Sequence, residues 1–321
     1  KLIKEINKIN IINFDILIVD DNSPDKTELK VKNLQKNNNN LLLIKRNGKF
    51  GLGSAHKRIF HFAKVHQYDA LITMDADFSH PPNLIKEFIK KNDQNTFIIG
   101  SRYTYGGSTD YNGYRKYISI IGNYVSRKLL KIPSYEITTS YRLFPKKILD
   151  SLNLSQIKSD GHAFFVEVLK IIHLKSFKIK EIPFHFSDRE KNVSKIPKMQ
   201  IFYSILRLLQ LTLIKKTHYK NSEINLSLCR ACHAQALIIY KKFNKEKKIN
   251  FLSTDFSCSS VIETKKQLDL YRCLDCNLIQ VAYDKAFDLE KLYSEVIDKN
   301  YIKNIDNKYK TFKNVLKKIK P

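Results

Sequence analysis

The sequence predicts an α/β fold in which functional residues gather at the carboxyl ends of the strands of a sheet. Two short apolar runs end in an acid, Phe14–Asp20 and Asp69–Asp75, and each is typical of a buried parallel strand. A glycine-rich turn at Gly48–Gly53 and a helical stretch from Ser54 to about Val65 lie between them. This alternation of strands and helices favours an α/β sheet with its sites at the strand ends.

Further elements continue this order along the chain. A short strand is expected at Leu41–Ile44, before the glycine-rich turn, and another at Thr96–Gly100. Tyr114–Lys131 is apolar at helical spacing, which predicts a helix. The composition shifts around Lys220–Ser227, so we assign residues 1–218 to the first domain.

The segment Met199–Ile214 is mostly apolar but carries Arg207 and Gln210 and is followed by Lys215 and Lys216. It is too short and too polar to span a bilayer. An amphipathic helix lying in a membrane interface fits this pattern, and so does a helix packed on its own domain.

Length and charge set outer limits on function. A chain of 321 residues with 43% hydrophobic content is long enough for more than one module. Its formal charge of +26 comes mainly from lysine and favours anionic partners, although a merely soluble lysine surface explains it equally well. Because no run of about 18 apolar residues and no signal peptide is found, we expect a cytosolic protein.

The strongest chemical signal is the pair of carboxylates in Asp75-Ala76-Asp77, at the end of an apolar run. Two acids so placed can approach one hard cation, Mg²⁺ or Mn²⁺, which would hold a diphosphate. Taken alone, two acids after a strand often cap the next helix or face water.

A second acidic run, Asp20-Asp21-Asn22-Ser23-Pro24-Asp25-Lys26-Thr27, follows the earlier strand. By itself it could be an ordinary Asx-rich turn. At the carboxyl end of a strand it could instead hold the base and ribose of a nucleotide.

Four motifs occur in order: I-V-D-D-N-S-P-D-K-T, K-F-G-L-G-S-A, M-D-A-D-F-S-H-P-P and G-S-R-Y. In order and approximate spacing they resemble the dolichol-phosphate mannosyltransferases, members of the family 2 glycosyltransferases. The resemblance runs from the first residue to about Lys198. It implies a GT-A fold, which is a Rossmann-like mixed sheet.

On the donor side the resemblance implies a nucleotide-sugar site, with GDP-mannose as the expected donor. Asp75 and Asp77 match the metal-binding pair, and Ser79 falls near the metal. The remaining donor-side candidates are Asp20, Asp21, Asp25, Arg46 and Lys49.

On the acceptor side the resemblance implies a lipid phosphate, dolichyl or polyprenyl phosphate. Arg102 belongs to the G-S-R-Y motif, and Arg115 with Ser119 matches the family's R-x-x-x-S. The i, i+4 spacing places Arg115 and Ser119 on one helix face, where an arginine and a hydroxyl suit a phosphate. Arg189 and Lys195 would close a basic loop over the phosphates.

The sequence departs from the family at three positions. Glu136 stands for an aspartate, Ser140 for a glycine and Asn192 for a glycine. Relatives also begin with an earlier strand, whereas Lys1–Ile12 resembles the helix that follows it, so we expect the first strand to be missing.

The expected mechanism follows from the acceptor. A phosphate monoester is ionised near neutral pH and can attack the anomeric carbon without a protein base. We therefore expect a single displacement with inversion, driven by the metal, the arginines and alignment of the reactants. Such an enzyme would work at the cytoplasmic face of a membrane, with residues 199–214 as a candidate interfacial helix and a membrane subunit as a further candidate partner.

Four cysteines form two C-x-x-C pairs, Cys229 with Cys232 and Cys273 with Cys276. This spacing predicts a structural four-cysteine Zn²⁺ site, with four reduced cysteines and no metal as the alternative. Cys258 is expected to be a bystander, although it could be a ligand. A basic zinc ribbon can bind nucleic acid, but the interleaved aromatic residues that stack bases are not evident, so nucleic acid is disfavoured.

The cysteine region, together with Y-R-C-L-D-C-N-L-I-Q-V-A, resembles the amino-terminal zinc-binding segment of a class of S-adenosylmethionine-dependent methyltransferases. The resemblance divides the remainder into a zinc-ribbon-like module at 226–282 and a helical region at 283–321. Since the glycine-rich cofactor strand of those relatives would follow only later, no methyltransferase activity is expected here.

Two rival functions remain open on the sequence alone. One is a family 2 transferase that uses another nucleotide sugar to build a surface polysaccharide. The other is a non-catalytic adaptor that binds membrane or nucleic acid. The intact acids and arginines argue against the adaptor, whereas the missing strand and the departures at Glu136 and Asn192 argue for it.

Overall fold

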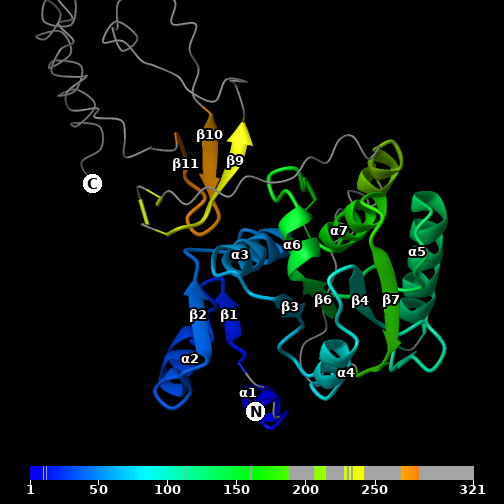
Figure 1. Ribbon diagram of the computed structural model, residues 1–321, viewed down its shortest axis with the longest axis horizontal. Helices are drawn as coiled ribbons and strands as arrows, with labels where there is room; N and C mark the ends of the chain where they lie inside the picture. The colour runs from blue at the N-terminus through cyan, green and yellow to red at the C-terminus, as the bar shows by residue number, and fades with distance from the viewer. Residues whose placement is uncertain are drawn as a thin grey trace, which may run out of the picture. The chain divides into compact units, whose positions relative to one another are not determined.

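A computed structural model of the chain describes residues 1–9, 11, 13–111, 113–159, 161–187, 206–214, 228, 229, 231, 232, 234–241 and 269–281 (Figure 1). The helices are α1 (Leu2–Asn7), α2 (Thr27–Gln35), α3 (Leu52–Val65), α4 (Leu84–Lys90), α5 (Tyr114–Leu130), α6 (Lys146–Ser151) and α7 (Ala163–Leu174). The strands are β1 (Ile16–Asp20), β2 (Leu41–Lys45), β3 (Ala70–Thr73), β4 (Thr96–Ser101), β5 (Ser108–Thr109), β6 (Arg142–Pro145), β7 (Lys178–Pro183), β8 (His185–Phe186), β9 (Leu237–Lys241), β10 (Leu270–Cys273) and β11 (Ile279–Val281).

The centre of the fold is a four-stranded mixed sheet in the order β3-β6-β4-β7. β4 and β7 pair in parallel, whereas β6 runs antiparallel to both β3 and β4. Every residue of β4 is buried, as expected for a strand covered on both faces. The predicted strands at 69–75 and 96–100 are therefore confirmed as β3 and β4.

Helices cover both faces of this sheet and give it two cores. Successive residues of a strand point to opposite faces, so Phe97 and Ile99 of β4 enter one core and Ile98 enters the other. On β6, Phe144 and Leu143 divide in the same way. α3, α6 and α7 contribute to the first core, while α1 and α4 contribute to the second.

β1 and β2 form a separate parallel pair in the described part of the chain. Their register aligns Asp20 with Lys45, so the residues that follow both strands meet at one edge. The expectation that the family's first strand is missing stays a prediction.

α3 links the two sheets, since it contacts both β1 and β3. The helix begins after Gly51, whose φ of 89° lies in the left-handed region, and glycine alone adopts such a backbone readily. The glycine-rich turn and helix expected at 48–65 are thus confirmed. α3 therefore lies beside both strands that lead into the acidic motifs.

The chain divides into two compact units, one of residues 1–238 and 273–278 and one of 239–272 and 279–321. All four paired cysteines belong to the first unit. β11, β10 and β9 lie in that order in a three-stranded sheet, with β10 and β11 antiparallel. Of the predicted domains, the linker near 220 and the region 283–321 lie outside the described residues.

Across the described ranges, none of the helices has the length and apolar character needed to cross a bilayer. The carboxyl-terminal part of the predicted interfacial segment is described from residue 206. Arg207 donates from Nη2 to Glu167 of α7 at 2.7 Å, and Leu211 is fully buried. This part packs on its own domain, while Leu209 and Leu213 stay exposed.

Candidate active site

Asp75 and Asp77 lie in the loop that follows β3, and hydrogen bonds orient both carboxylates. Ser140 donates its hydroxyl to Asp75 Oδ1 at 2.7 Å. Ser79 donates both its hydroxyl and its backbone N–H to Asp77 Oδ1, at 2.6 and 3.1 Å. Phe78, which lies between Asp77 and Ser79 in the sequence, has a φ of 65°. This left-handed conformation is uncommon for an aromatic residue and is often found at functional sites.

His80 supports this loop as a neutral imidazole. The backbone N–H of Asp75 donates to its Nδ1 at 2.9 Å, so that nitrogen carries no proton. Burial lowers the pKa of His80, outweighing the nearby carboxylates that raise it. The 4.0 Å separation between Nδ1 and the Asp75 carboxylate is therefore not an ion pair, and His80 fixes the backbone instead.

The donor set at this loop fits the metal predicted for it. Carboxylate oxygens are ligands that Mg²⁺ and Mn²⁺ accept readily. The side chain of Asp75 is 36% exposed, and Asp77 is exposed, so a cation can reach both. Ser140 and Ser79 are placed as hydrogen-bonding partners that would orient such ligands.

At the neighbouring strand ends, Arg46 forms a bidentate ion pair with Asp21. Its Nε donates to Oδ1 at 2.6 Å and its Nη2 to Oδ2 at 2.5 Å. Arg46 is fully buried, and its Nη1 also donates to Ser54 at 2.8 Å. The sequence placed both Asp21 and Arg46 at the donor, but the structure joins them to one another, so Arg46 positions Asp21.

The other donor-side candidates have simpler surroundings. Asp20 is buried and accepts from the backbone N–H of Ser23 at 3.4 Å. Asp25 is exposed and accepts from Thr27 at the start of α2, and this hydrogen bond lowers the pKa of the carboxyl. Lys49 is exposed after β2. Asp25 thus has a local hydrogen-bonding partner, Thr27, that accounts for its position.

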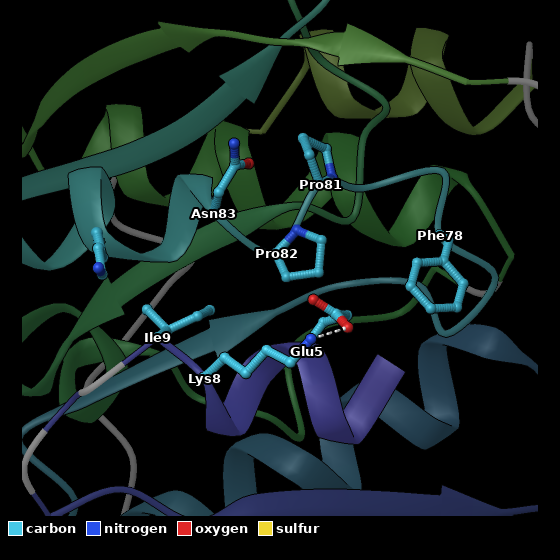
Figure 2. A pocket seen from close by; sticks show the side chains of 8 residues that line it. Glu5, Lys8, Ile9, Phe78, Pro81, Pro82 and Asn83 are labelled. Atoms are coloured by element: carbon cyan, nitrogen blue, oxygen red, sulfur yellow. Dashed lines mark hydrogen bonds and ion pairs between the residues drawn. The ribbon is translucent and has the colours of Figure 1, made fainter. Parts of the chain in front are cut away.

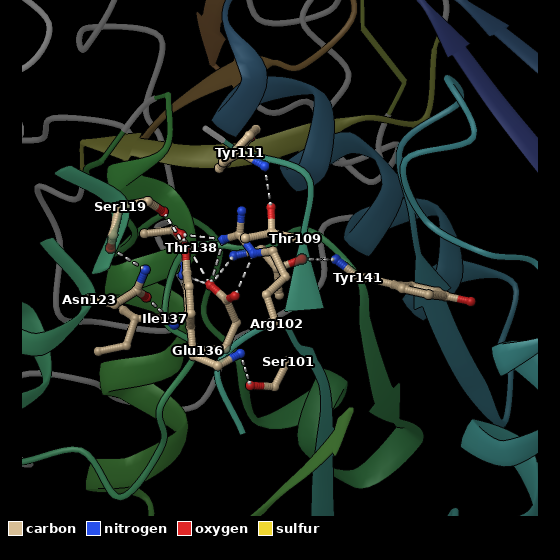
Figure 3. Close-up of polar contacts among 12 residues, drawn as sticks. Ser101, Arg102, Thr109, Tyr111, Ser119, Asn123, Glu136, Ile137, Thr138 and Tyr141 are labelled. Atoms are coloured by element: carbon tan, nitrogen blue, oxygen red, sulfur yellow. Dashed lines mark hydrogen bonds and ion pairs between the residues drawn. The ribbon is translucent and has the colours of Figure 1, made fainter. Parts of the chain in front are cut away.

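Arg102, a candidate of the predicted acceptor side, forms a buried ion pair with Glu136 (Figure 3). Arg102 Nε donates to Glu136 Oε2 at 2.7 Å and Nη2 to Oε1 at 2.9 Å. Burial alone would lower the pKa of Arg102, but the charge and hydrogen bonds of Glu136 more than offset it and raise that pKa. Arg102 also lies over the rings of Tyr103, Tyr111 and Phe186, so its guanidinium is enclosed by protein.

A second acid holds the segment that carries Glu136. Glu181 of β7 accepts from the backbone N–H groups of Tyr135 and Glu136, at 3.0 and 2.8 Å. Glu136 in turn accepts from the N–H groups of Thr138 and Thr139. Arg102, Thr138 and Thr139 thus satisfy the Glu136 carboxylate, which stands where the family resemblance expects aspartate. The same segment continues to Ser140, beside the acidic loop.

Of the remaining acceptor candidates, Ser119 on α5 is described, and Tyr103 donates its hydroxyl to Ser119 Oγ at 2.6 Å. The backbone of Arg115 lies in the first turn of α5, but its side chain is outside the described part. Arg189 and Lys195 also lie outside it. The shared helix face of Arg115 and Ser119 stays a prediction.

The sulfur atoms of Cys229, Cys232, Cys273 and Cys276 all lie within 4.8 Å of one another. The Sγ atoms of Cys229 and Cys276 are 3.5 Å apart, and those of Cys232 and Cys273 are 3.6 Å apart. Zinc–thiolate bonds of about 2.3 Å in a tetrahedron place sulfurs about 3.8 Å apart. The four thiolates therefore fit a tetrahedral Zn²⁺ ion.

A pocket lies between α1 and the segment that follows the acidic loop (Figure 2). Phe78 and Pro82 line it from one side, and Glu5 of α1 and Lys8, which directly follows α1, line it from the other. The predicted site residues are absent from its lining. We therefore place the candidate active site at the strand ends and not in this pocket.

A mixed sheet with paired, oriented acids after its strands is the arrangement of a GT-A glycosyltransferase domain. The profile of the glycosyl transferase family 2 matches residues 1–152. Polyprenol monophosphomannose synthase of Mycolicibacterium smegmatis is 33% identical over 184 residues, which cover 56% of this chain and 69% of the relative. Undecaprenyl-phosphate mannosyltransferase of Micrococcus luteus is 32% identical over 183 residues, or 57% of this chain and 75% of the relative.

The chain therefore belongs to glycosyltransferase family 2 and is a glycosyltransferase, and the predicted fold class is confirmed. Among solved structures, glucosyl-3-phosphoglycerate synthase from Mycobacterium tuberculosis, in complex with Mn²⁺, UDP-glucose and phosphoglyceric acid, is 13% identical with a TM-score of 0.48. The likeness covers 72% of this chain and 78% of that chain. It is too distant to bear on the ligands or the reaction of this protein.

Proposed function

We propose that this glycosyltransferase moves a hexose, mannose from GDP-mannose, onto dolichyl or polyprenyl phosphate at the cytoplasmic face of a membrane. The two curated relatives support the acceptor, because both names specify a polyprenyl phosphate and mannose. The observation that carries the proposal is the orientation of Asp75 and Asp77 by Ser140 and Ser79. That arrangement prepares a site for a cation and a diphosphate.

Asp75 and Asp77 would hold Mg²⁺ or Mn²⁺, which offsets the charge that develops on the departing nucleoside diphosphate. Asp20 and Asp21 would contact the nucleotide. Arg46 keeps the Asp21 carboxylate in place through two hydrogen bonds. The donor is thus held from two strand ends beside α3.

The acceptor phosphate attacks the anomeric carbon as the bond to the diphosphate breaks, and the configuration inverts. No protein base is needed because the phosphate is already ionised. Ser119 and the predicted cations Arg115, Arg189 and Lys195 would align the phosphate. Arg102 is a positioning residue. It holds Glu136, and the segment that contains Glu136 also contains Ser140, which donates to Asp75.

The exposed face of residues 206–214 supports attachment to a membrane surface. Leu209 and Leu213 are 51% and 78% exposed, while Arg207 and Leu211 anchor the opposite face. A helix held in this way can present leucines to a bilayer interface. The four-cysteine site is proposed to hold structural Zn²⁺.

The test is transfer of radiolabelled mannose from GDP-mannose to a polyprenyl phosphate by the full chain, with Mn²⁺ or Mg²⁺. Asp77→Ala removes a metal ligand, and we expect the rate to fall about 100-fold or more. Asp150→Asn is the matched control, because Asp150 pairs with Lys146 on α6.

Transfer by the wild type and the control, lost in Asp77→Ala, would support donor, acceptor and metal together. Absence of transfer by folded wild-type protein with GDP-mannose, but transfer with a UDP-sugar, would overturn the donor. Transfer to a free sugar in preference to the lipid phosphate would overturn the acceptor.

A further inference from the structure

The second cysteine pair contacts the glycosyltransferase domain through the residues between its cysteines. Asp275 accepts from Arg58 Nε of α3 at 2.6 Å. Both side chains are nearly buried, with exposed fractions of 11% and 10%. A buried charge-assisted hydrogen bond of this kind is costly to break from one side, so it anchors the loop on α3.

The same loop touches the segment that follows β2. The backbone N–H of Asn47 donates to the Asp275 carbonyl at 3.4 Å. Arg46 Nη1 lies 3.5 Å from the Leu274 carbonyl, a long contact, and the site is buried. These contacts all fall within one compact unit, residues 1–238 and 273–278.

Arg46 thereby connects the cysteine loop with the donor side. Its Nε and Nη2 hold the Asp21 carboxylate, while Nη1 lies between Ser54 and Leu274. A guanidinium is a rigid planar fork, so its donors move together. A shift of the loop would therefore change the direction in which Asp21 points.

The loop owes its shape to the cysteines on either side of it. Its backbone amide at Asp275 donates to Cys273 Sγ at 3.4 Å, and Cys273 and Cys276 belong to the group that fits a tetrahedral Zn²⁺ ion. Sites of this type are ordered by their metal and lose structure when it is removed. Metal binding would thus fix Leu274 and Asp275 against Arg46 and Arg58.

We propose that Zn²⁺ bound by Cys229, Cys232, Cys273 and Cys276 positions the donor-site pair Arg46–Asp21, through docking of Asp275 on Arg58. Zinc would then stabilise the nucleotide site as well as the cysteine region that binds it. The docking is independent of the proposed function, whereas its effect on the nucleotide rests on the placement of the donor at Asp21.

The first measurement is hydrogen–deuterium exchange of the full chain with its zinc content measured, before and after chelation by a thiol-compatible chelator. Loss of zinc is expected to increase exchange in peptides that cover residues 45–58. Asp275→Asn keeps all four cysteines, so it should retain zinc and still increase exchange in the same peptides. Asp150→Asn is the control and should leave them unchanged.

The second measurement is binding of GDP with Mn²⁺ by calorimetry. Chelation and Asp275→Asn are each expected to weaken GDP binding about fivefold or more, the lower range of coupling between linked sites. Cys276→Ser, which removes a ligand, should lose zinc and reproduce the chelated state. Readdition of Zn²⁺ should restore the wild type but not Cys276→Ser.

The outcomes separate the two ideas. A wild-type chain without bound zinc, or exchange at 45–58 that is the same with and without zinc, would overturn the docking. Zinc-dependent exchange together with unchanged GDP affinity would overturn the coupling to the donor site. If another nucleotide binds in place of GDP, the proposed donor fails, and the coupling is then tested with that nucleotide.

Discussion

Arg102 and Glu136 lie 34 residues apart in the sequence and meet in a bidentate ion pair that water hardly reaches. Glu136 is fully buried, and Arg102 is 7% exposed. Burial alone raises the pKa of Glu136, but Arg102 more than offsets it and lowers that pKa. Both partners are therefore charged in the folded protein, and each depends on the other.

Replacement of Glu136 by glutamine should destabilise the fold. Arg102 would keep its charge in a buried site without a carboxylate, which costs about 3 to 5 kcal/mol. The free energy of unfolding in urea, measured at pH 7, tests this.

Two further variants give the stability losses with which that of Glu136→Gln is compared. Glu136→Asp restores the family's acid and should lose less stability than Glu136→Gln. Glu87→Gln removes the partly exposed partner of Lys91 and should cost less than about 1 kcal/mol. An equal loss in Glu87→Gln and Glu136→Gln would contradict the role of burial.

Ser140→Ala should weaken metal activation, because Asp75 loses the hydroxyl that orients its carboxylate. Loss of such a supporting hydrogen bond typically costs about 10- to 100-fold in metal affinity or activity. The concentration of Mn²⁺ that gives half-maximal transfer is the quantity to measure.

Ser151→Ala is the control for this serine, since Ser151 donates only to a carbonyl of its own helix, α6. Its activation by Mn²⁺ should match the wild type. Unchanged activation in Ser140→Ala would remove Ser140 from the site.

Acid should destabilise the fold through His56. This side chain is buried against Phe164 and Phe165, and burial lowers its pKa from 6.5 to about 4. Below pH 6.5, His56 binds a proton in the unfolded chain but stays neutral in the folded chain. The free energy of unfolding therefore falls between about pH 6.5 and 4, by about 3 kcal/mol at most.

His56→Leu should flatten the decline of unfolding free energy across that pH window. His185→Gln serves as the comparison, because His185 is an exposed histidine with an exposed partner, Asp110. Equal slopes for wild type and His56→Leu would show that other groups control the acid sensitivity.

Replacement of Leu209 and Leu213 by serine should weaken binding to vesicles of anionic lipid. Both side chains are exposed, and burial of a leucine contributes roughly 1.5 to 3 kcal/mol, so binding should fall about tenfold or more. Cosedimentation with vesicles measures it.

Leu29→Ser on α2 is the matched control, as Leu29 is 53% exposed on a different helix. The double variant should keep the wild-type melting temperature, because Arg207 and Leu211 still anchor the segment. Wild-type binding by the double variant would exclude this face from a membrane contact.

Much of the fold could be predicted because its signals are local. Apolar runs that end in an acid gave β1 and β3, and the glycine-rich turn located the start of α3 within about two residues. The spacing of the four cysteines predicted their cluster, and Asp75 and Asp77 were singled out by their place at the end of an apolar run and by the family motif. The supporting partner Ser140 was visible only as a departure from the family, with no sign of what it contacts.

The sequence by itself determined the family, the four strands that became β1 to β4 and the acids after β1 and β3, because these depend on residue type and short spacing. Tertiary structure alone decided which cations remain available to a ligand. Arg46 was expected at the donor and Arg102 on the acceptor side, yet each is enclosed with a carboxylate, Asp21 or Glu136, 25 or 34 residues away. The physical reason is that burial makes an unpaired charge costly, and only the folded chain shows which side chains are buried together.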